Sequence, residues 1–162
     1  MEKGTRYLTQ AALIAAIYVV FTLPFATFGT NYIQVRVAEA LAILPFFTPA
    51  AIPGLTIGCL LSNAFISPYG MIDIVFGTLA TLIASYWSFR IKNKYLVPIP
   101  PIVVNAIIVG ALIYYGKFDV LEFNGIILSY MGGVALGQTI ACYGLGMPLL
   151  SALERYKTKI FE

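Results

Sequence analysis

Long apolar runs occupy most of the chain, and only short polar or proline-containing segments separate them. Hydrophobic residues make up 60% of the 162 residues, and charged residues make up 10%. An average soluble domain has about 25% charged residues, because it must cover its surface in water. This chain has too few, so we expect it to fold in lipid, as one domain over residues 1–162 with no room for a separate soluble domain.

A membrane-spanning helix needs about 20 mostly apolar residues, and six runs are interpreted as such spans, although the second is short. They cover residues 8–28, 35–47, 50–66, 71–89, 98–116 and 125–150. Prolines mark several boundaries, and Ser67-Pro68-Tyr69-Gly70 predicts a tight turn between the third and fourth runs. The sequence therefore predicts an all-α integral membrane protein, folded as a compact bundle of six transmembrane helices.

The basic residues predict the orientation of this bundle. With six spans and both termini in the cytoplasm, the inner segments hold Lys3, Arg6, Arg90, Lys92, Lys94, Arg155, Lys157 and Lys159. The outer loops hold Lys117, beside Asp119 and Glu122. This bias follows the positive-inside rule, and an odd number of spans would break it. The first run is too long for a signal peptide and further spans follow it, so we expect a multi-pass protein of the cytoplasmic membrane.

Three ionisable residues interrupt the apolar runs: Arg36, Glu39 and Asp73. Each costs several kcal/mol at membrane depth unless it is paired or faces a watery cavity. In the six-span arrangement all three lie on the outer side, at the level of Asn63 and Asn124. Tyrosines surround this level, namely Tyr32, Tyr69, Tyr114, Tyr115 and Tyr130. The convergence predicts a cavity that opens to the outside and binds a small molecule.

Structural interpretations of the same residues stay open. Arg36 and Glu39 are three residues apart on a helix and would neutralise each other. The tyrosines would form an interfacial belt, and Asn63 would be a hydrogen-bond donor between helices. Cys59 and Cys142 have no metal-site or disulfide spacing, so we expect both to be small buried residues.

Several kinds of chemistry are excluded. The chain contains no histidine, which rules out zinc sites built on histidine and His-dependent triads. No Walker A motif is present, so the chain does not hydrolyse ATP by itself. We expect no metal, no cofactor and no enzymatic activity.

Small residues mark two helices as sites of close packing. Ala11, Ala12, Ala15 and Ala16 lie near the cytoplasmic end of the first run, and the last run contains Gly133, Gly137 and Ala141. Small side chains allow helix backbones to approach closely in lipid. The stripes predict packing inside the bundle, and the alanine patch is wide enough to contact an external helix as well.

Four segments resemble the QueT family of membrane proteins. They are Gln34-Val-Arg-Val-Ala-Glu39-Ala-Leu-Ala, Thr48-Pro-Ala-Ala-Ile-Pro-Gly54, Gly70-Met-Ile-Asp73 and Gly77-Thr-Leu-Ala-Thr81. The family comprises substrate-binding S components of energy-coupling-factor (ECF) transporters. The resemblance implies a six-helix bundle that captures a queuosine precursor, a 7-deazaguanine base such as preQ0, preQ1 or queuine, at its outer face.

The resemblance also implies partners, and the chemistry of such a ligand suggests residue roles. The partners are a transmembrane coupling subunit, contacted through the alanines of the first helix, and two ATPase subunits. A carboxylate, Glu39 or Asp73, would accept the N1–H and exocyclic amine of a guanine-like edge. Asn63 or Gln138 would meet the carbonyl edge. The substrate-binding set expected here comprises Arg36, Glu39, Asn63, Asp73, Asn124, Tyr130 and Gln138. The alternative is a small proton- or sodium-coupled transporter with Glu39 and Asp73 as its ion relay.

Overall fold

The computed structural model describes residues 2–24 and 36–156 of the chain, and side chains from residue 4 onward. Tyr32, Gln34, Lys157 and Lys159, and the side chain of Lys3, lie outside this described part, as do residues 25–28 and 35 of the two first expected spans. The described residues contain helices and no strand. The expectation of an all-α membrane protein is therefore confirmed in this part of the chain.

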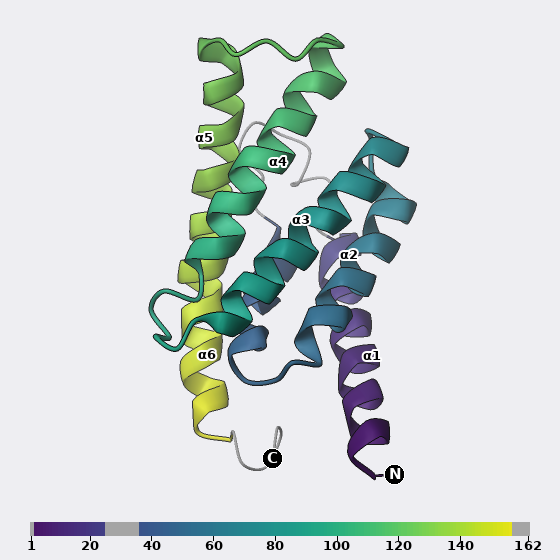
Figure 1. Cartoon of the computed structure of the whole chain (residues 1–162), viewed down its shortest axis with the longest axis vertical. Helices are drawn as coiled ribbons and strands as arrows, with labels where there is room; N and C mark the ends of the chain where they lie inside the picture. The colour runs from purple at the N-terminus through teal and green to yellow at the C-terminus, as the bar shows by residue number, and fades with distance from the viewer. Residues whose placement is uncertain (1, 25–35, 157–162) are drawn as a thin grey trace.

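Six helical rods follow one another along the described part of the chain (Figure 1). The first four are α1 (Glu2–Thr22), η2 (Val37–Phe46), α2 (Ala51–Ile66) and α3 (Met71–Arg90). They are followed by α4 (Ile99–Phe118) and by a continuous rod of α5 (Gly125–Thr139), the π-helix η3 (Ile140–Gly146) and α6 (Met147–Glu154). Both ends of the described chain lie at the same end of the bundle, as six alternating rods require.

Four of the described rods are long and apolar enough to cross a membrane: α1, α3, α4 and the rod from α5 to α6. The other two are apolar but shorter, with 10 residues in η2 and 16 in α2. A 3₁₀-helix of 10 residues rises about 20 Å, less than the roughly 30 Å of a hydrocarbon core. The helix expected over residues 35–47 is thus present, but it crosses only part of the membrane.

The two ends of the bundle carry different charged residues. The start of α1, the end of α3, the loop between α3 and α4 and the end of α6 lie toward the end of the bundle where N and C are marked (Figure 1). We call it the basic end because these segments carry Arg6, Arg90, Lys92, Lys94 and Arg155. The loop between α4 and α5, with Asp119 and Glu122, lies at the opposite end, here called the far end. This arrangement has the charge distribution that the sequence predicts for an even number of rods.

Local chemistry sets the helix boundaries near the far end. Gly70 adopts a φ of 62° and precedes α3, a conformation that glycine accepts without strain. Asp119 ends α4 in the left-handed conformation. Asn124 caps α5, because its Oδ1 accepts hydrogen bonds from the backbone N–H groups of Ile126 and Ile127 at 3.0 and 3.1 Å.

The interface between α1 and α2 depends on glycine. A Cβ on Gly54 would lie 2.8 Å from the backbone oxygen of Ala11, and one on Gly58 would lie 2.8 Å from the Cβ of Tyr18. Ala11 and Ala15 are buried in this interface. The two parallel helices therefore approach so closely that no side chain fits between them at these positions.

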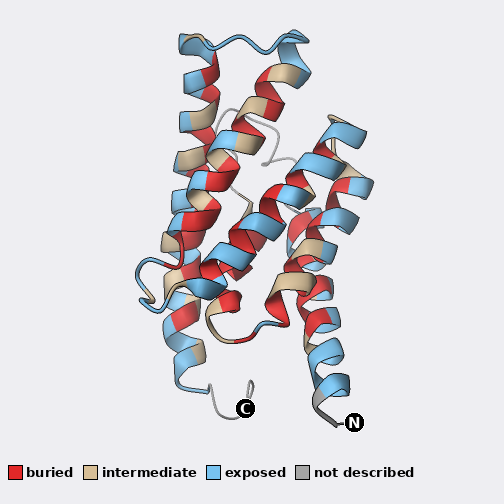
Figure 2. Cartoon of the chain, in the orientation of Figure 1, coloured by how far each residue is buried: buried red, intermediate tan, exposed pale blue. Residues whose placement is uncertain are grey.

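Buried residues face the centre of the bundle (Figure 2), and many large hydrophobic residues are exposed on its outer surface. Phe65 on α2 and Leu136 on α5, for example, are 75% and 59% exposed. Continuous apolar surface of this extent is untenable in water but is what lipid requires. Cys59 and Cys142 are free and buried, as expected for small interior residues.

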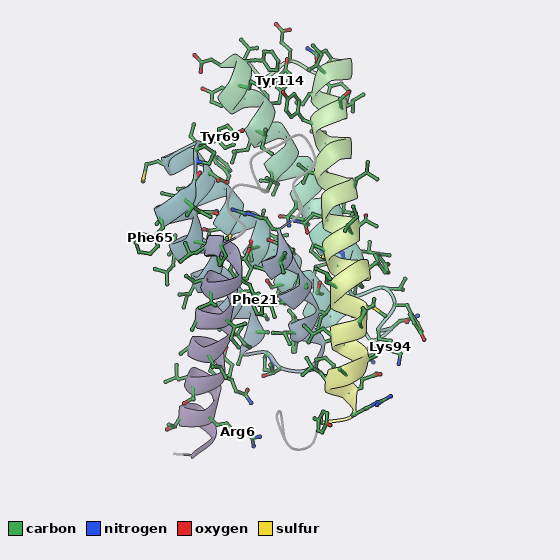
Figure 3. The ribbon with its side chains drawn as sticks, turned by 180° about the vertical axis from the view of Figure 1, so that it is seen from behind. Arg6, Phe21, Phe65, Tyr69, Lys94 and Tyr114 are labelled. Atoms are coloured by element: carbon green, nitrogen blue, oxygen red, sulfur yellow. The ribbon has the colours of Figure 1, made fainter. Side chains whose placement is uncertain are left out.

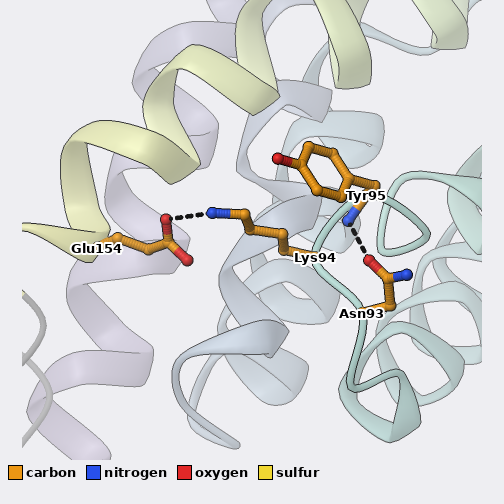
Figure 4. A network of polar contacts seen from close by, with 4 residues as sticks. All are labelled: Asn93, Lys94, Tyr95 and Glu154. Carbon is orange, nitrogen blue, oxygen red and sulfur yellow. Dashed lines mark hydrogen bonds and ion pairs between the residues drawn. The ribbon is translucent and has the colours of Figure 1, made fainter.

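At the basic end, a salt bridge joins the loop between α3 and α4 to α6. Lys94 Nζ lies 2.8 Å from Glu154 Oε2, and the Asn93 side chain accepts a hydrogen bond from the backbone N–H of Tyr95 (Figure 4). The hydrogen bond from Lys94 to Glu154 raises the pKa of the lysine. Tyr143 also donates to the backbone oxygen of Tyr95 at 2.9 Å. These contacts tie the loop before α4 to the last rod.

Candidate functional site

A chain of hydrogen bonds joins three of the expected site residues. Arg36, which precedes η2, donates through Nη2 to Asn63 Oδ1 at 2.7 Å. Asn63 donates in turn through Nδ2 to the backbone oxygen of Asp73 at 3.2 Å. The Asp73 carboxylate accepts a 2.6 Å hydrogen bond from Ser67. Asn63 and Asp73 are 1% and 6% exposed, so this polar group is shielded where α2 and α3 meet.

Glu39 lies one 3₁₀ turn further along η2, toward the basic end, with a different partner. Tyr18 of α1 donates its phenolic hydrogen to Glu39 Oε1 at 2.7 Å, and both residues are buried. Cys142 in η3 lies behind Glu39, with its Sγ 3.5 Å from the Glu39 backbone oxygen and 3.6 Å from Gln138 Oε1. Gln138 thus belongs to the neighbourhood of Glu39.

A small cavity adjoins Glu39. Its volume is about 10 Å³, which is room for about one water molecule, and Thr81, Ser85 and Asn105 help to line it. Thr81 and Ser85 donate their hydroxyl hydrogens to backbone oxygens of α3, so lone pairs remain for the cavity. Asn105 is 3% exposed and is one of the residues that line this cavity. The amide is therefore placed to bind a group that enters this space.

An aromatic group occupies the far end of α4 and α5. The rings of Tyr114 and Tyr130 meet edge to face with centroids 6.1 Å apart, and Lys117 Nζ lies 5.8 Å from the centroid of Tyr130. Asn124 donates to the Tyr114 hydroxyl at 2.9 Å in addition to capping α5. At 1.5 Å per residue, Asn124 lies about 21 Å from Gln138 along the same rod. These two expected site residues cannot contact one small ligand together.

Tyr69 lies near both the aromatic group of Tyr114 and Tyr130 and the hydrogen-bonded group of Ser67 and Asp73. It lies in the turn before α3, and its ring packs so closely on Gly116 that a Cβ added there would collide with it (Figure 3). Burial raises the pKa of the Tyr69 phenol, and the neighbouring Tyr130 and Asp73 raise it further. The Tyr69 backbone N–H donates to the hydroxyl of Ser67, which donates in turn to Asp73, and the Tyr69 side chain packs against the cluster that contains Tyr130.

The structure distinguishes between the interpretations that the sequence leaves open. In the hydrogen bonds of the described residues, Arg36 donates to Asn63 and Tyr18 donates to Glu39, so the Arg36–Glu39 pair that the sequence leaves open is not joined by a hydrogen bond there. Sequence reasoning missed Tyr18, Ser67 and Asn105 as neighbours of the site. For Asn105 a signal existed, since an amide inside an apolar run needs a partner.

The four alanines of α1 face two ways. Ala11 and Ala15 are buried against α2, whereas Ala12 and Ala16 are exposed. On the last rod, Gly133, Gly137 and Ala141 are all buried. The stripe on the last rod therefore serves packing inside the bundle, and only half of the alanine patch is open to an external helix.

Comparison with known proteins identifies the family. A model of the QueT transporter family matches residues 8–155. The chain belongs to the QueT transporter family. It is also 37% identical over 86 residues to the "Queuosine precursor transporter QueT" of Lactococcus lactis subsp. cremoris (strain MG1363), a match that covers 51% of this chain.

That match spans about half the length of the curated relative, 50% of it. No solved structure matches the chain significantly. The family and the apolar helices together make this chain a multi-pass membrane protein of a transporter family. The buried carboxylates and amides of this QueT-family chain are therefore candidates for contact with a transported molecule.

Proposed function

We propose that this protein is the substrate-capture subunit of an importer for a queuosine precursor, a 7-deazaguanine base. The observation that carries the proposal is the pair of buried carboxylates, Glu39 and Asp73, with Arg36 and the amides of Asn63 and Asn105 around them. A guanine-like edge presents two adjacent N–H donors and a carbonyl acceptor. Carboxylates and amides are the groups that match such an edge inside a membrane.

The base would lie on the far-end side of Glu39, beside Arg36 and Asp73. The cavity at Glu39 is too small for a ring system, so only a substituent of the ligand would enter it. Tyr69 is connected to Asp73 through the Ser67 hydroxyl and would offer an aromatic face for stacking. Because the charge bias makes the basic end cytoplasmic, this position is reached from outside the cell.

The binding experiment uses the purified chain and measures affinity for preQ0, preQ1 and queuine, with riboflavin, thiamine and biotin as unrelated ligands. Glu39→Gln and Asp73→Asn should each weaken binding by about 2–4 kcal/mol, roughly thirty- to a thousand-fold, because a charged acceptor is lost opposite a ligand donor. Glu122→Gln, which changes an acid in the exposed loop at the far end, is the matched control and should leave affinity unchanged.

Two outcomes would contradict the proposal. The first is the absence of binding of all three 7-deazaguanines to folded protein. The second is unchanged affinity in both carboxylate variants, which would make Glu39 and Asp73 structural. Melting temperatures of the same variants show whether each remains folded, so a loss of binding can be separated from a loss of structure.

We further propose that an ATPase module energises transport through a coupling subunit that contacts the exposed alanines of α1. Ala12→Trp and Ala16→Trp should abolish uptake while ligand binding by the isolated subunit persists, since both side chains point away from the bundle. Ala11→Trp should instead unfold the protein, because Gly54 lies directly against it. Uptake by the chain alone, driven by a proton or sodium gradient, would contradict this part of the proposal.

A further inference from the structure

The polar side chains that line the small cavity beside Glu39 offer mainly hydrogen-bond acceptors. Glu39 is 4% exposed, and the Tyr18 hydroxyl gives its hydrogen to one oxygen of this carboxylate. Thr81 donates its hydroxyl hydrogen to the backbone oxygen of Gly77 at 3.1 Å, and Ser85 donates to the backbone oxygen of Thr81. Their hydroxyl hydrogens are therefore in use, and the two oxygens present lone pairs to the cavity.

The lining of this cavity also carries a negative charge. Glu39 is the one acid among the lining residues of the described chain, and no lysine or arginine lines the cavity there. Arg36 donates to Asn63 instead. Residues 25–35, which lie outside the described part, contain no lysine or arginine that could add a positive charge. A carboxylate buried in a membrane protein is stabilised by a cation, so this cavity favours a positively charged group.

The size of the cavity restricts that group. The space holds about one water molecule, and a protonated primary amine is of similar size. Such an amine has three N–H donors and no acceptor. It can donate to Glu39 and, at the same time, to the oxygens of Thr81 or Ser85 and to the amide oxygen of Asn105. A nitrile is neutral and only accepts hydrogen bonds, so it matches none of these oxygens.

We propose that this cavity binds the protonated aminomethyl group of preQ1, so that Glu39 selects the substituent of the base. This inference rests on the proposed function, in which the base lies on the far-end side of Glu39 and only a substituent enters the cavity. In preQ0 a nitrile takes the place of the aminomethyl group. In queuine the amine nitrogen carries a further ring, which exceeds the volume of the cavity. The protein should therefore bind preQ1 more tightly than either of the other two bases.

The test is isothermal titration calorimetry of the purified full chain with preQ1, preQ0 and queuine in sodium-free buffer. The readout is the Kd of preQ0 divided by the Kd of preQ1. For the wild type this ratio should be about ten to a hundred, the contribution of hydrogen bonds between charged groups. Glu39→Gln should bring the ratio close to one, because its loss of affinity falls on preQ1. If Glu39 served only packing, both ligands would weaken equally and the ratio would not change.

Thr81→Val tests the cavity without removing a charge. It keeps the shape of the side chain and should lower the ratio about fivefold, because the amine loses one acceptor. Thr78→Val on the same helix is the matched control. The Thr78 hydroxyl is buried without a hydrogen-bond partner among the described residues and does not line this cavity, so the ratio should stay at the wild-type value.

The possible failures of this inference and of the proposed function differ. Equal affinity of the wild type for preQ1 and preQ0 would overturn the inference and leave the proposed function standing. An affinity for preQ0 that rises to that for preQ1 when sodium is added would place a metal ion in the cavity, which also overturns it. The absence of binding of all three bases to folded protein would contradict the proposed function itself.

Discussion

Tyr18 is the residue that fixes the position of Glu39 at the atomic scale. Its hydroxyl donates to the carboxylate at 2.7 Å, and the tyrosine is only 1% exposed. A buried carboxylate oxygen without a donor is unfavourable by several kcal/mol in an apolar medium, so a nearby donor is essential. Because Tyr18 belongs to α1, the bond also connects the first rod to η2.

Removal of the Tyr18 hydroxyl is expected to destabilise the protein. Tyr18→Phe should lower the free energy of unfolding by about 1–3 kcal/mol, because the ring still fills its space while Glu39 loses a donor. Thermal unfolding in detergent measures the change. Tyr7→Phe removes a hydroxyl from a 40% exposed tyrosine on the same helix and should have almost no effect. Equal melting temperatures for the two variants would show that the Tyr18 hydroxyl is dispensable.

The sequence identified the ionisable residues of the site better than their partners. Glu39 and Asp73 stand out because charge is rare in apolar runs, and both are indeed buried. Their hydrogen-bond donors, Tyr18 and Ser67, are common residue types in membrane helices and turns, so composition does not distinguish them. The Tyr18–Glu39 pair is separated by 21 residues along the chain, and only the packing of α1 against η2 brings the two together.

At the scale of helices, the glycines of α2 determine how near α1 can lie. Gly58→Ala should lower the free energy of unfolding by about 1–3 kcal/mol, because its Cβ would lie 2.8 Å from the Cβ of Tyr18 and 3.1 Å from the Ala15 backbone oxygen. One of these atoms is a Cβ and the other is a backbone oxygen, so neither can move unless α1 itself moves. Thermal unfolding of the purified variants measures the effect.

The matched control for this change is Gly132→Ala. Gly132 lies on α5, where an added Cβ would have nothing within 4 Å, so alanine should stabilise the helix by up to about 1 kcal/mol through its higher helix propensity. Opposite signs for the two substitutions are the expected result. A Gly58→Ala protein as stable as Gly132→Ala would mean that α1 and α2 are free to separate.

The helical segments follow from the sequence, but the form of η2 does not. Apolar run length predicts where helices lie, and the ends at Gly70 and Asn124 follow from turn and cap chemistry. Residues 35–47 also read as an apolar run, whereas the structure has a 3₁₀-helix of 10 residues with Pro45 inside it. This segment packs on η3, where a Cβ on Gly146 would lie 3.2 Å from the Ala40 backbone oxygen, and contacts between such distant segments leave no local pattern in the sequence.

For the whole molecule, the orientation in the membrane can be tested by chemical labelling. Lys92→Cys at the basic end should react only with reagents that reach the cytoplasm, and Glu122→Cys at the far end only with external ones. The native Cys59 and Cys142 are buried and should contribute little background in folded protein. Reaction of both introduced cysteines from the same side would contradict the arrangement of six rods.

The contact between η2 and the π-helix η3 also determines the order in which the protein can mature during synthesis. A Cβ on Gly146 would lie 3.2 Å from the Ala40 backbone oxygen. Part of the surface against which η2 packs therefore belongs to a segment that is translated much later. At roughly 5–20 residues per second, the ribosome needs about 5–20 s to reach it. Throughout that interval the main contacts open to η2 are those with α1, α2 and α3, and the hydrogen bond from Tyr18 already serves the Glu39 carboxylate. The packing of η2 against η3 is therefore completed only after the last rod has been synthesised, and the part of the fold around Glu39 is among the last to reach its final form.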